Sequence, residues 1–404
     1  MITPLPVPVA GEEAHTWIAS PDGMAGRARL ARASGTYRSC VPGVIADYDP
    51  AVPSELAADV EEATAALTRF DGYAARVLGV ASPMLGPMSA VLLRTESISS
   101  SRIENLTVGA RQLALAEIGQ ASSSNARLVA GNVKAMEAAL ALAGDLSEDT
   151  ILAMREALLS HQTGWESHAG RYRDRLVWVG RSGLGPVGAT HVAPQPDLVS
   201  PAMGDLVAFV RRRDLPVGLQ IAVAHAQFET IHPFADGNGR TGRALVHAML
   251  ANLGVVTHTT APVSAGLLVN TETYFRALTD YRRGDARPIV ERFADASRMA
   301  ATTGMRLVDD LAAQVEQARG LLQGTRPQAT AWRVLPHLVA QPVVNTQYLI
   351  CALGLSEMTA NRALRQLADA GVLQERTGYR RNRVWQHAGI LQVLDAYAES
   401  LRRG

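Results

Sequence analysis

The sequence predicts a mainly α-helical fold with one short β-hairpin and a separate basic unit at its C-terminal end. Three observations carry this prediction. Apolar residues recur with helical spacing along most of the 404 residues. Residues 164–200 are instead rich in glycine and proline and contain alternating apolar stretches, which is typical of a loop with a hairpin. Residues 325–404 hold ten arginines against five acidic residues, in a chain whose total net charge is +1.

The helices can be placed from their spacing. The first 50 or so residues lack periodicity, so we expect an irregular or extended lead-in. Helices are predicted at 54–78, 88–103, 114–144, 147–161, 201–213, 217–231, 241–253 and 271–305, with one further helix and a linker over 306–330. We expect three domains: an N-terminal helical region over 1–115, a central core over 116–310, and a linker helix with a small domain over 311–404.

The composition excludes several classes of protein. With 47% hydrophobic residues, the chain has enough apolar area to offset the entropy lost on folding, which argues against disorder. No stretch of about 18 uncharged apolar residues occurs, so we expect no membrane partner. The N-terminus does not resemble a secretory signal, and Cys40 and Cys351 support neither a disulfide framework nor a zinc cluster. These features predict a cytoplasmic protein.

Lysine is almost absent, which limits how the protein can recognise phosphate. Lys134 is the only lysine, and no GxxxxGK[ST] phosphate loop is present. Phosphate recognition would therefore depend on arginine and on backbone N–H groups.

The strongest motif is HPFADGNGRTGR at 232–243, between two predicted helices. Pro233 disfavours helical geometry at His232, so the first helix should end there. Gly237 and Gly239 permit a tight turn. A glycine-rich turn that leads into a helix N-terminus presents unpaired N–H groups and a positive dipole end, which suits phosphate.

The charged side chains of this motif fit the same chemistry. Arg240 and Arg243 are three residues apart, so both can reach an anion held by the turn. Asp236 offers a hard oxygen ligand for Mg²⁺. His232 could accept a proton from an attacking hydroxyl. A surface helix-turn-helix would explain a bare GNG turn, but it does not explain the whole string.

This string resembles the HxFx[DE]GNGRxxR signature of the Fic family. The resemblance implies a Fic-type helical bundle that transfers a nucleotide, usually AMP from ATP, to a hydroxyl of a target protein. By position it assigns these roles: general base, His232; Mg²⁺ ligand, Asp236; anion hole, Gly237, Asn238 and Gly239; phosphate binding, Arg240; γ-phosphate binding, Arg243; apolar core anchor, Phe234.

A second stretch, SSSRIEN at 99–105, is open to two interpretations. Taken alone, it is typical of a helix end with a solvated Glu104 and a capping Asn105. Together with the Fic motif, Ser100, Glu104 and Asn105 resemble the family's inhibitory pattern [ST]xxxE[GN]. The resemblance implies an N-terminally inhibited class, in which Glu104 pairs with Arg243 and competes with the γ-phosphate. The stretch around Asn132 is also similar to that class.

The glycine-rich segment is similar to the flap hairpin of the family. Three stretches carry this resemblance: GRYR at 170–173, VWVG at 177–180 and HVAPQP at 191–196. The flap residues that it implies are Val177, Val179, His191 and Val192. An exposed hairpin edge can pair with an extended target segment and so position its hydroxyl. Tyr274 and Tyr281 fall where the family often contacts adenine, although a helical tyrosine more often packs in the core.

The C-terminal unit looks like a winged helix-turn-helix. Predicted helices at 332–339, 346–353 and 358–370, the last capped by Ser356 and Gly371, precede a strand–turn–strand around 377–379. Such a unit binds DNA or docks proteins, and both alternatives stay open. The side chains expected to face a partner are Thr359, Arg362 and Arg365 on the third helix and Arg376, Arg380, Arg381 and Arg383 on the wing.

The sequence therefore predicts an autoinhibited protein adenylyltransferase that uses Mg²⁺ and ATP and modifies a Ser, Thr or Tyr hydroxyl of a target protein or of itself. One alternative is a hydrolase that removes AMP at the same site. Another is a DNA-binding transcriptional regulator with a Fic sensor domain. The candidate partners are ATP, an unidentified target protein and DNA. A homodimer is considered as well, because the family often forms dimers.

Overall fold

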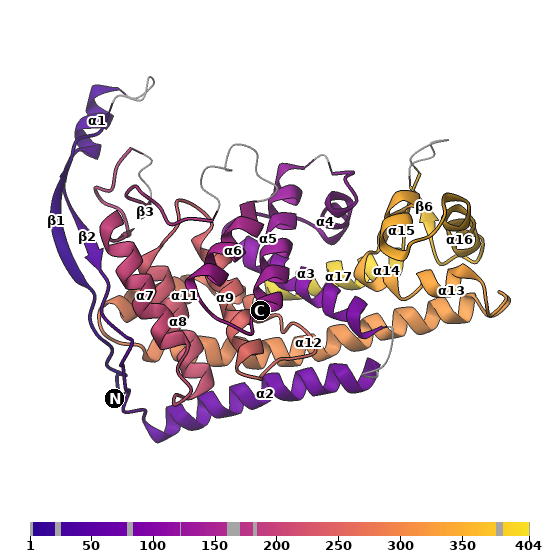
Figure 1. Cartoon of the computed structure of the whole chain (residues 1–404), viewed down its shortest axis with the longest axis horizontal. Helices are drawn as coiled ribbons and strands as arrows, with labels where there is room; N and C mark the ends of the chain where they lie inside the picture. Colours follow the sequence, from indigo (N-terminus) through magenta and orange to yellow (C-terminus); the bar gives the residue numbers. More distant parts are fainter. Residues whose placement is uncertain are drawn as a thin grey trace. The chain divides into compact units, whose positions relative to one another are not determined.

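The computed structural model describes residues 3–20, 26–78, 84–121, 123–159, 170–180, 184–376 and 383–403. It is mainly helical, with three small antiparallel sheets (Figure 1). The chain forms two compact units. Unit 1 comprises Met1–Glu62, Ala138–Leu253 and Thr271–Ala294, and unit 2 comprises Ala63–Glu137, Gly254–Asn270 and Asp295–Gly404. Each unit draws on three stretches of the chain, whereas the sequence predicts contiguous domains, whose boundaries stay a prediction.

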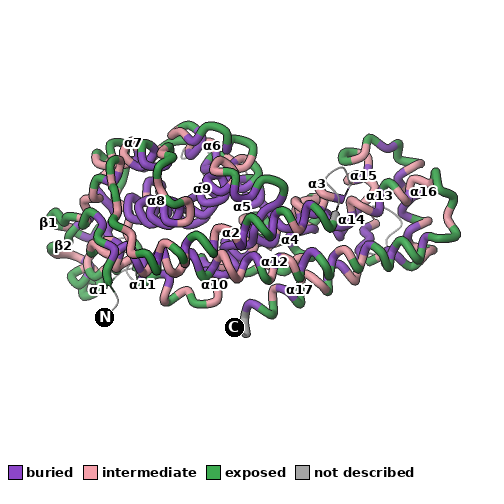
Figure 2. The backbone as a smooth tube through the Cα atoms, turned by 90° about the horizontal axis from the view of Figure 1, so that it is seen from below, coloured by how far each residue is buried: buried purple, intermediate pink, exposed green. Residues whose placement is uncertain are grey.

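Unit 1 is built around two helices that are buried on all sides. Every residue of α8 from Leu219 to Ile231 is buried, and so is every residue of α9 from Asn238 to Leu250, as the purple tube in Figure 2 shows. Helix α8 contacts α7, α9 and α11, and α6 contacts α9. The elements of this unit are β1 (Gly11–Trp17), α1 (Arg27–Ala33), β2 (Gly35–Val41), α6 (Glu148–Leu159), β3 (Trp178–Val179), β4 (His191–Val192), η2 (Pro196–Leu198), α7 (Val199–Val210), α8 (Val217–Ile231), α9 (Asn238–Asn252) and α11 (Thr271–Arg282).

The expected irregular lead-in contains a regular sheet. Strands β1 and β2 pair antiparallel from Gly11↔Val41 to Trp17↔Gly35. Trp17 in turn packs edge-on against Trp178 of β3. The two strands are separated by α1 and its flanking residues, so no tight hairpin turn marks them in the sequence. Tertiary packing thus fixes a pairing that local periodicity does not indicate.

Unit 2 combines long helices with a small C-terminal sheet, in which the strand order is β5-β7-β6. The chain passes from one unit to the other within helices α2, α5 and α12, and again on either side of α10. The remaining elements are α2 (Ser54–Leu78), α3 (Leu85–Ile103), α4 (Ala110–Glu117), α5 (Ser124–Ala141), α10 (Val263–Val269), α12 (Arg287–Leu321), α13 (Thr330–Val334), α14 (His337–Ala340), β5 (Val343–Asn345), α15 (Thr346–Leu353), α16 (Glu357–Asp369), β6 (Gln374–Glu375), β7 (Val384–Gln386) and α17 (Ala388–Arg403).

Helix ends differ from the expectations mainly at glycine and proline. The predicted helix at 114–144 is two helices, since Gly119 takes a left-handed conformation after α4. The predicted helix at 271–305 is likewise divided, at Gly284 with φ 100°. Beyond that break α12 runs on without interruption to Leu321, so the separate helix expected after 305 is wrong. Pro336 separates α13 from α14, and α10 and α17 were not predicted.

Within the described residues, no helix is both long enough and apolar enough to cross a lipid bilayer.

Candidate active site

The turn between α8 and α9 forms the centre of the candidate site. His232 ends α8 in the left-handed conformation, with φ 51° and ψ 59°, and its backbone N–H donates to the Phe228 carbonyl at 2.9 Å. Pro233 explains this ending, because it disfavours helical geometry at the preceding residue. Gly237 is also left-handed, with φ 74°, and α9 starts at Asn238. The first N–H groups of α9 have no partner within the helix and point out of its N-terminal end.

Asn238 closes this turn with its side chain. Its Oδ1 accepts from the Phe234 N–H and its Nδ2 donates to the Phe234 carbonyl, both at 2.8 Å, and the residue is 3% exposed. The Asn238 amide is therefore committed to holding the loop. The predicted anion hole would then use the backbone N–H groups of residues 237–239.

Phe234 and Gly237 fix the shape of the loop from beneath. The Phe234 side chain is 1% exposed, and its ring lies close to those of Phe228 and Tyr172. The left-handed backbone at Gly237 favours glycine, and a Cβ there would lie 2.7 Å from Leu158 Cδ2, so that the leucine would have to move. The anchoring role of Phe234 stays a prediction.

Arg173 ties the flap to the end of α8. Its Nε donates to the His232 carbonyl at 2.8 Å, its Nη2 donates to the Pro194 carbonyl at 2.7 Å, and its backbone N–H donates to the Pro233 carbonyl at 2.9 Å. A cation at a helix C-terminus is also favoured by the helix dipole. The sequence gives Arg173 only as part of the flap resemblance. Its role depends on contacts some 60 residues away, which no local pattern encodes.

The His232 imidazole is held by one face of α8 and faces the flap. Its Nδ1 lies 3.3 Å from the Glu229 carbonyl oxygen and 3.6 Å from Glu229 Oε2. With the proton on Nδ1, Nε2 carries the lone pair that a general base needs. The neighbouring His191 ring stands edge-on, 6.3 Å away between centroids. Burial, reinforced by Arg282, holds the pKa of His191 well below its usual range, so His191 stays neutral.

Asp236 fits a metal ligand that acts together with a bound phosphate. Its side chain is 46% exposed, and Oδ2 lies 3.3 Å from Arg240 Nη2. The described residues contain no group of three or more His, Cys, Asp or Glu side chains that could hold a metal ion. Mg²⁺ commonly binds through one or two carboxylates while water and substrate phosphates complete its shell. A single accessible carboxylate is consistent with that mode.

Arg243 is buried on α9, and its charge acts on the core. The residue is 2% exposed. Burial, together with the charge of Arg243, lowers the pKa of His225 to about 3. His225 Nε2 lies 2.7 Å from the Tyr274 hydroxyl, and the Tyr281 hydroxyl donates to Gln227 Oε1 at 2.9 Å. Both tyrosines are buried, so the structure gives them core roles instead of the adenine contact that their positions suggest.

The flap hairpin lies beside His232 and borders a cleft of unit 1. Strands β3 and β4 pair through Trp178↔Val192 and Val179↔His191, and the Thr190 N–H donates to the Val179 carbonyl at 2.8 Å. Val179 is 44% exposed, Val177 is half-buried, and His191 and Val192 are buried. A cleft of about 670 Å³ runs between β2, β4 and the end of α11, where Arg38, His191 and Arg282 contribute to its lining.

The predicted inhibitory residues lie in unit 2, at the end of α3. Asn105 follows the helix in the left-handed conformation, with φ 61°, and the Leu106 N–H donates back to the Ser101 carbonyl at 3.0 Å. This is the ordinary way to end a helix, and asparagine is tolerated there. Ser100 is buried, whereas Glu104 and Asn105 are exposed. The pairing of Glu104 with Arg243 stays a prediction.

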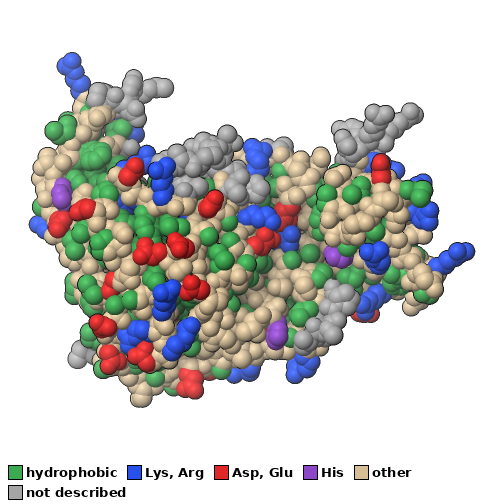
Figure 3. Space-filling model, viewed as in Figure 1, with side chains coloured by type: hydrophobic (Ala, Val, Ile, Leu, Met, Phe, Trp, Pro, Cys, Tyr) green, Lys and Arg blue, Asp and Glu red, His purple; other side chains and the backbone are tan. Residues whose placement is uncertain are grey.

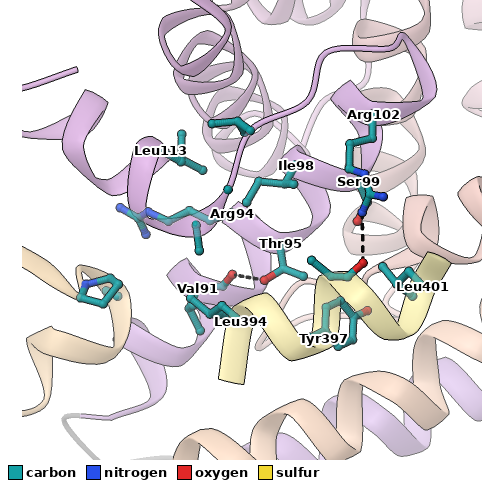
Figure 4. Close-up of a pocket in the computed structure, with 16 residues that line it drawn as sticks. Val91, Arg94, Thr95, Ile98, Ser99, Arg102, Leu113, Leu394, Tyr397 and Leu401 are labelled. Carbon is teal, nitrogen blue, oxygen red and sulfur yellow. Dashed lines mark hydrogen bonds between the residues drawn. The ribbon is translucent and has the colours of Figure 1, made fainter. Parts of the chain in front are cut away.

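Helix α3 is held on two sides within unit 2. The buried Asn132 of α5 donates to the Ser97 carbonyl at 2.9 Å and to Ser101 Oγ at 3.2 Å. On the side shown in Figure 4, Arg102 donates to the Ala398 carbonyl of α17 at 3.3 Å, beside a small, mainly apolar pocket. The last turn of α3 is therefore fixed by its own unit.

One of the arginines that were expected to face a partner is paired within the C-terminal sheet. Arg362 and Arg365 are exposed on α16. Arg383 instead pairs with Glu375 of β6 and lies over the Trp385 ring. Arg380 and Arg381 lie outside the described residues. On the face shown in Figure 3, acidic and basic side chains are interspersed among the described residues. A winged helix-turn-helix that binds DNA stays a prediction.

Comparison with known proteins finds similarity to one family. Residues 145–250 match the Fic/DOC family. The chain is 30% identical over 165 residues to the protein adenylyltransferase Fic of Nematostella vectensis, covering 38% of this chain and 34% of that protein. It is 31% identical over 157 residues to the protein adenylyltransferase fic-1 of Caenorhabditis elegans, covering 38% and 27%. The chain thus spans about a third or less of the length of these curated relatives.

The fold has a counterpart among solved structures. A Fic family protein from Desulfovibrio desulfuricans G20 superimposes with a TM-score of 0.51 at 24% sequence identity, covering 82% of this chain and 96% of that one. The matched residues 145–250 contain α6, the flap, α8 and the turn at 232–243. Residues 145–250 of this chain, which hold the candidate site, are therefore similar to the Fic/DOC family.

Proposed function

We propose that this protein transfers AMP from ATP to a Ser, Thr or Tyr hydroxyl of a target protein or of itself. The observation that carries the proposal is the geometry of the turn. His232 ends α8 in the left-handed conformation, and a short turn leads from it to the N-terminal end of α9, which carries the buried Arg240 and Arg243. A base is thus combined with an anion site within 12 residues of chain.

In the proposed mechanism, the N–H groups of residues 237–239 and the guanidinium groups of Arg240 and Arg243 bind the phosphates of ATP. Mg²⁺, when bound through Asp236, would neutralise negative charge on the phosphates. His232 Nε2 accepts the proton of the acceptor hydroxyl, whose oxygen attacks the α-phosphorus while the bond to pyrophosphate breaks. The orientation of His232 depends on Arg173 and on the Glu229 carbonyl.

We further propose that Glu104 restrains this reaction. A carboxylate bound to Arg243 would occupy the guanidinium that otherwise binds the γ-phosphate through two hydrogen bonds. ATP would then bind poorly or in an unreactive orientation. The support for this is the match of Ser100, Glu104 and Asn105 to the inhibitory pattern, together with the exposed position of Glu104 at the end of α3.

The flap and the adjoining cleft supply room for an extended target segment.

Transfer of label from α-³²P-ATP to protein tests the proposal directly. With Mg²⁺ present, we expect weak self-labelling of the wild type, stronger labelling of Glu104→Gly and none of His232→Ala. Equal labelling of all three would contradict the mechanism. A panel of the four nucleoside triphosphates tests the choice of ATP. If wild type removes AMP from a modified protein faster than Glu104→Gly does, the reverse reaction is the main activity.

A further inference from the structure

Arg155 of α6 is a buried cation that none of the roles above includes. The residue is 0% exposed, and none of its three guanidinium nitrogens has a hydrogen-bond partner among the described residues. Burial of a guanidinium without such partners is strongly unfavourable. Arginine keeps its charge at neutral pH, so this charge persists inside unit 1. The groups that surround the Arg155 guanidinium should therefore indicate why this charge is buried.

The Arg155 guanidinium lies directly behind the phosphate-binding turn. Its Cζ is 5.5 Å from the centroid of the Phe234 ring. Its Nη1 lies 3.1 Å from the point that a Cβ on Gly237 would occupy. The charges that act on Arg155 are those of Asp236 and Arg240, both on the same turn. The side chain is thus aimed at the turn that presents the N–H groups of α9.

Charged side chains gather at this turn. The turn and its surroundings combine the guanidinium groups of Arg155, Arg240 and Arg243 with the carboxylate of Asp236. Because this part of unit 1 is largely buried, such charges interact more strongly than they would in water. A nucleoside triphosphate with its metal ion remains anionic, so the unpaired charge of Arg155 would favour its binding at this turn.

We infer that Arg155 is a further determinant of polyphosphate binding, and that it acts from behind the turn by its charge. This inference rests on the proposed function, because it assigns Arg155 to the same nucleotide site. Arg155 is a positioning and electrostatic residue, not a catalytic one, because it lies behind the backbone that would touch the phosphates. Its effect should grow with the number of phosphates on the ligand.

The test compares two replacements of Arg155 in the full chain. Arg155→Met keeps a long apolar stem but removes the charge, whereas Arg155→Lys keeps the charge. Affinities for ATP, ADP and AMP with Mg²⁺ would be measured by calorimetry over a range of salt concentrations. We expect Arg155→Met to weaken ATP binding by about tenfold, ADP binding less and AMP binding least, and to reduce the salt dependence. Arg155→Lys should retain most of the affinity.

Two controls separate this inference from the proposed function. Arg211→Met removes a charge from an exposed site of the same unit and should leave all three affinities unchanged. Arg243→Met should weaken ATP binding. If Arg243→Met weakens binding but Arg155→Met does not, the inference is overturned and the function stands. If neither the wild type nor Glu104→Gly, which lacks the proposed inhibitory carboxylate, binds nucleotide, the proposed function itself fails.

A folding defect would also be informative. If Arg155→Met does not fold, the ratio of ATP to AMP affinity in Arg155→Lys and Arg155→Gln decides the question. If Arg155→Lys keeps the wild-type ratio of affinities and Arg155→Gln loses it, the charge at position 155 favours polyphosphate binding. A ratio kept by both means that Arg155 serves packing only.

Discussion

Two helices of this protein end in the same unusual backbone conformation but for different reasons. Among the described residues, Asn105 after α3 and His232 after α8 are the only non-glycine residues with positive φ. Asn105 is exposed, and hydrogen bonds of its own helix end close the turn around it. His232 is followed by Pro233, and its carbonyl is held by Arg173 of the flap.

The difference shows that the backbone at the end of α3 has a local cause, whereas the backbone at the end of α8 has a tertiary cause. An asparagine can adopt the left-handed conformation with help from its short side chain, so the end of α3 can be explained from sequence alone. Histidine has no such advantage, and strain of this kind persists where surrounding structure fixes it and often marks function. The end of α8 is therefore the one where a change in distant contacts should affect chemistry.

Replacing His232 should have the largest effect. His232→Ala removes the general base and should lower the rate of AMP transfer by about 10²-fold or more. His232→Gly should be equally inactive yet at least as stable as His232→Ala, because glycine relieves the left-handed strain. Transfer rates and urea unfolding of both variants check this. A His232→Gly protein that is much less stable than His232→Ala would show that the backbone there is not strained.

Replacing Arg173 should have the next largest effect. It tests whether the hydrogen bonds of Arg173 hold the backbone of His232 in place. Arg173→Met removes the donors to the carbonyls of His232 and Pro194, so we expect kcat to fall by about tenfold to 10²-fold with little change in ATP affinity. The matched exposed replacement, Arg171→Met, should leave both unchanged. An equal loss of ATP affinity in Arg173→Met would contradict a positioning role.

The acid stability of the protein should depend on the buried face of α8. The pKa of His225 is lowered to about 3 when folded, against 6.5 for an ordinary histidine. The unfolded chain therefore binds the proton more readily. The contribution of His225 to stability is complete above about pH 6.5 and is lost as the pH falls toward 3, by up to about 1.4 kcal/mol per pH unit. Urea unfolding of wild type and His225→Gln between pH 7 and 4 should show a weaker pH dependence in the variant.

Replacing Asn105 should have the smallest effect, because the left-handed backbone at Asn105 has a local cause. Asn105→Gly should be neutral or slightly stabilising, whereas Asn105→Ala should cost about 1 kcal/mol through the left-handed backbone. Thermal unfolding measures both. A loss of several kcal/mol in Asn105→Gly would mean that the side chain itself holds α3, and the contrast with His232 would weaken.

The distinction between local and tertiary causes also explains which features the sequence could predict. The helix at 217–231, the turn at 232–243 and the flap hairpin follow from periodicity, proline and glycine, and the structure has all three. The β1–β2 pairing was missed because its strands lack a local turn signal. The contacts of Arg173 and Arg155 were missed because each residue lies near a turn about 60 to 80 residues away along the chain. The division of 271–305 at Gly284 depends on a single left-handed glycine that periodicity overlooks.

The most direct test of the central claim is the intact mass of the Glu104→Gly protein after incubation with ATP and Mg²⁺, with and without the added His232→Ala change. We predict a mass gain of one AMP per modified residue in Glu104→Gly, located by peptide sequencing on a Ser, Thr or Tyr, and no gain in the double variant. A gain that persists without His232, or a gain of phosphate instead of AMP, would contradict the account.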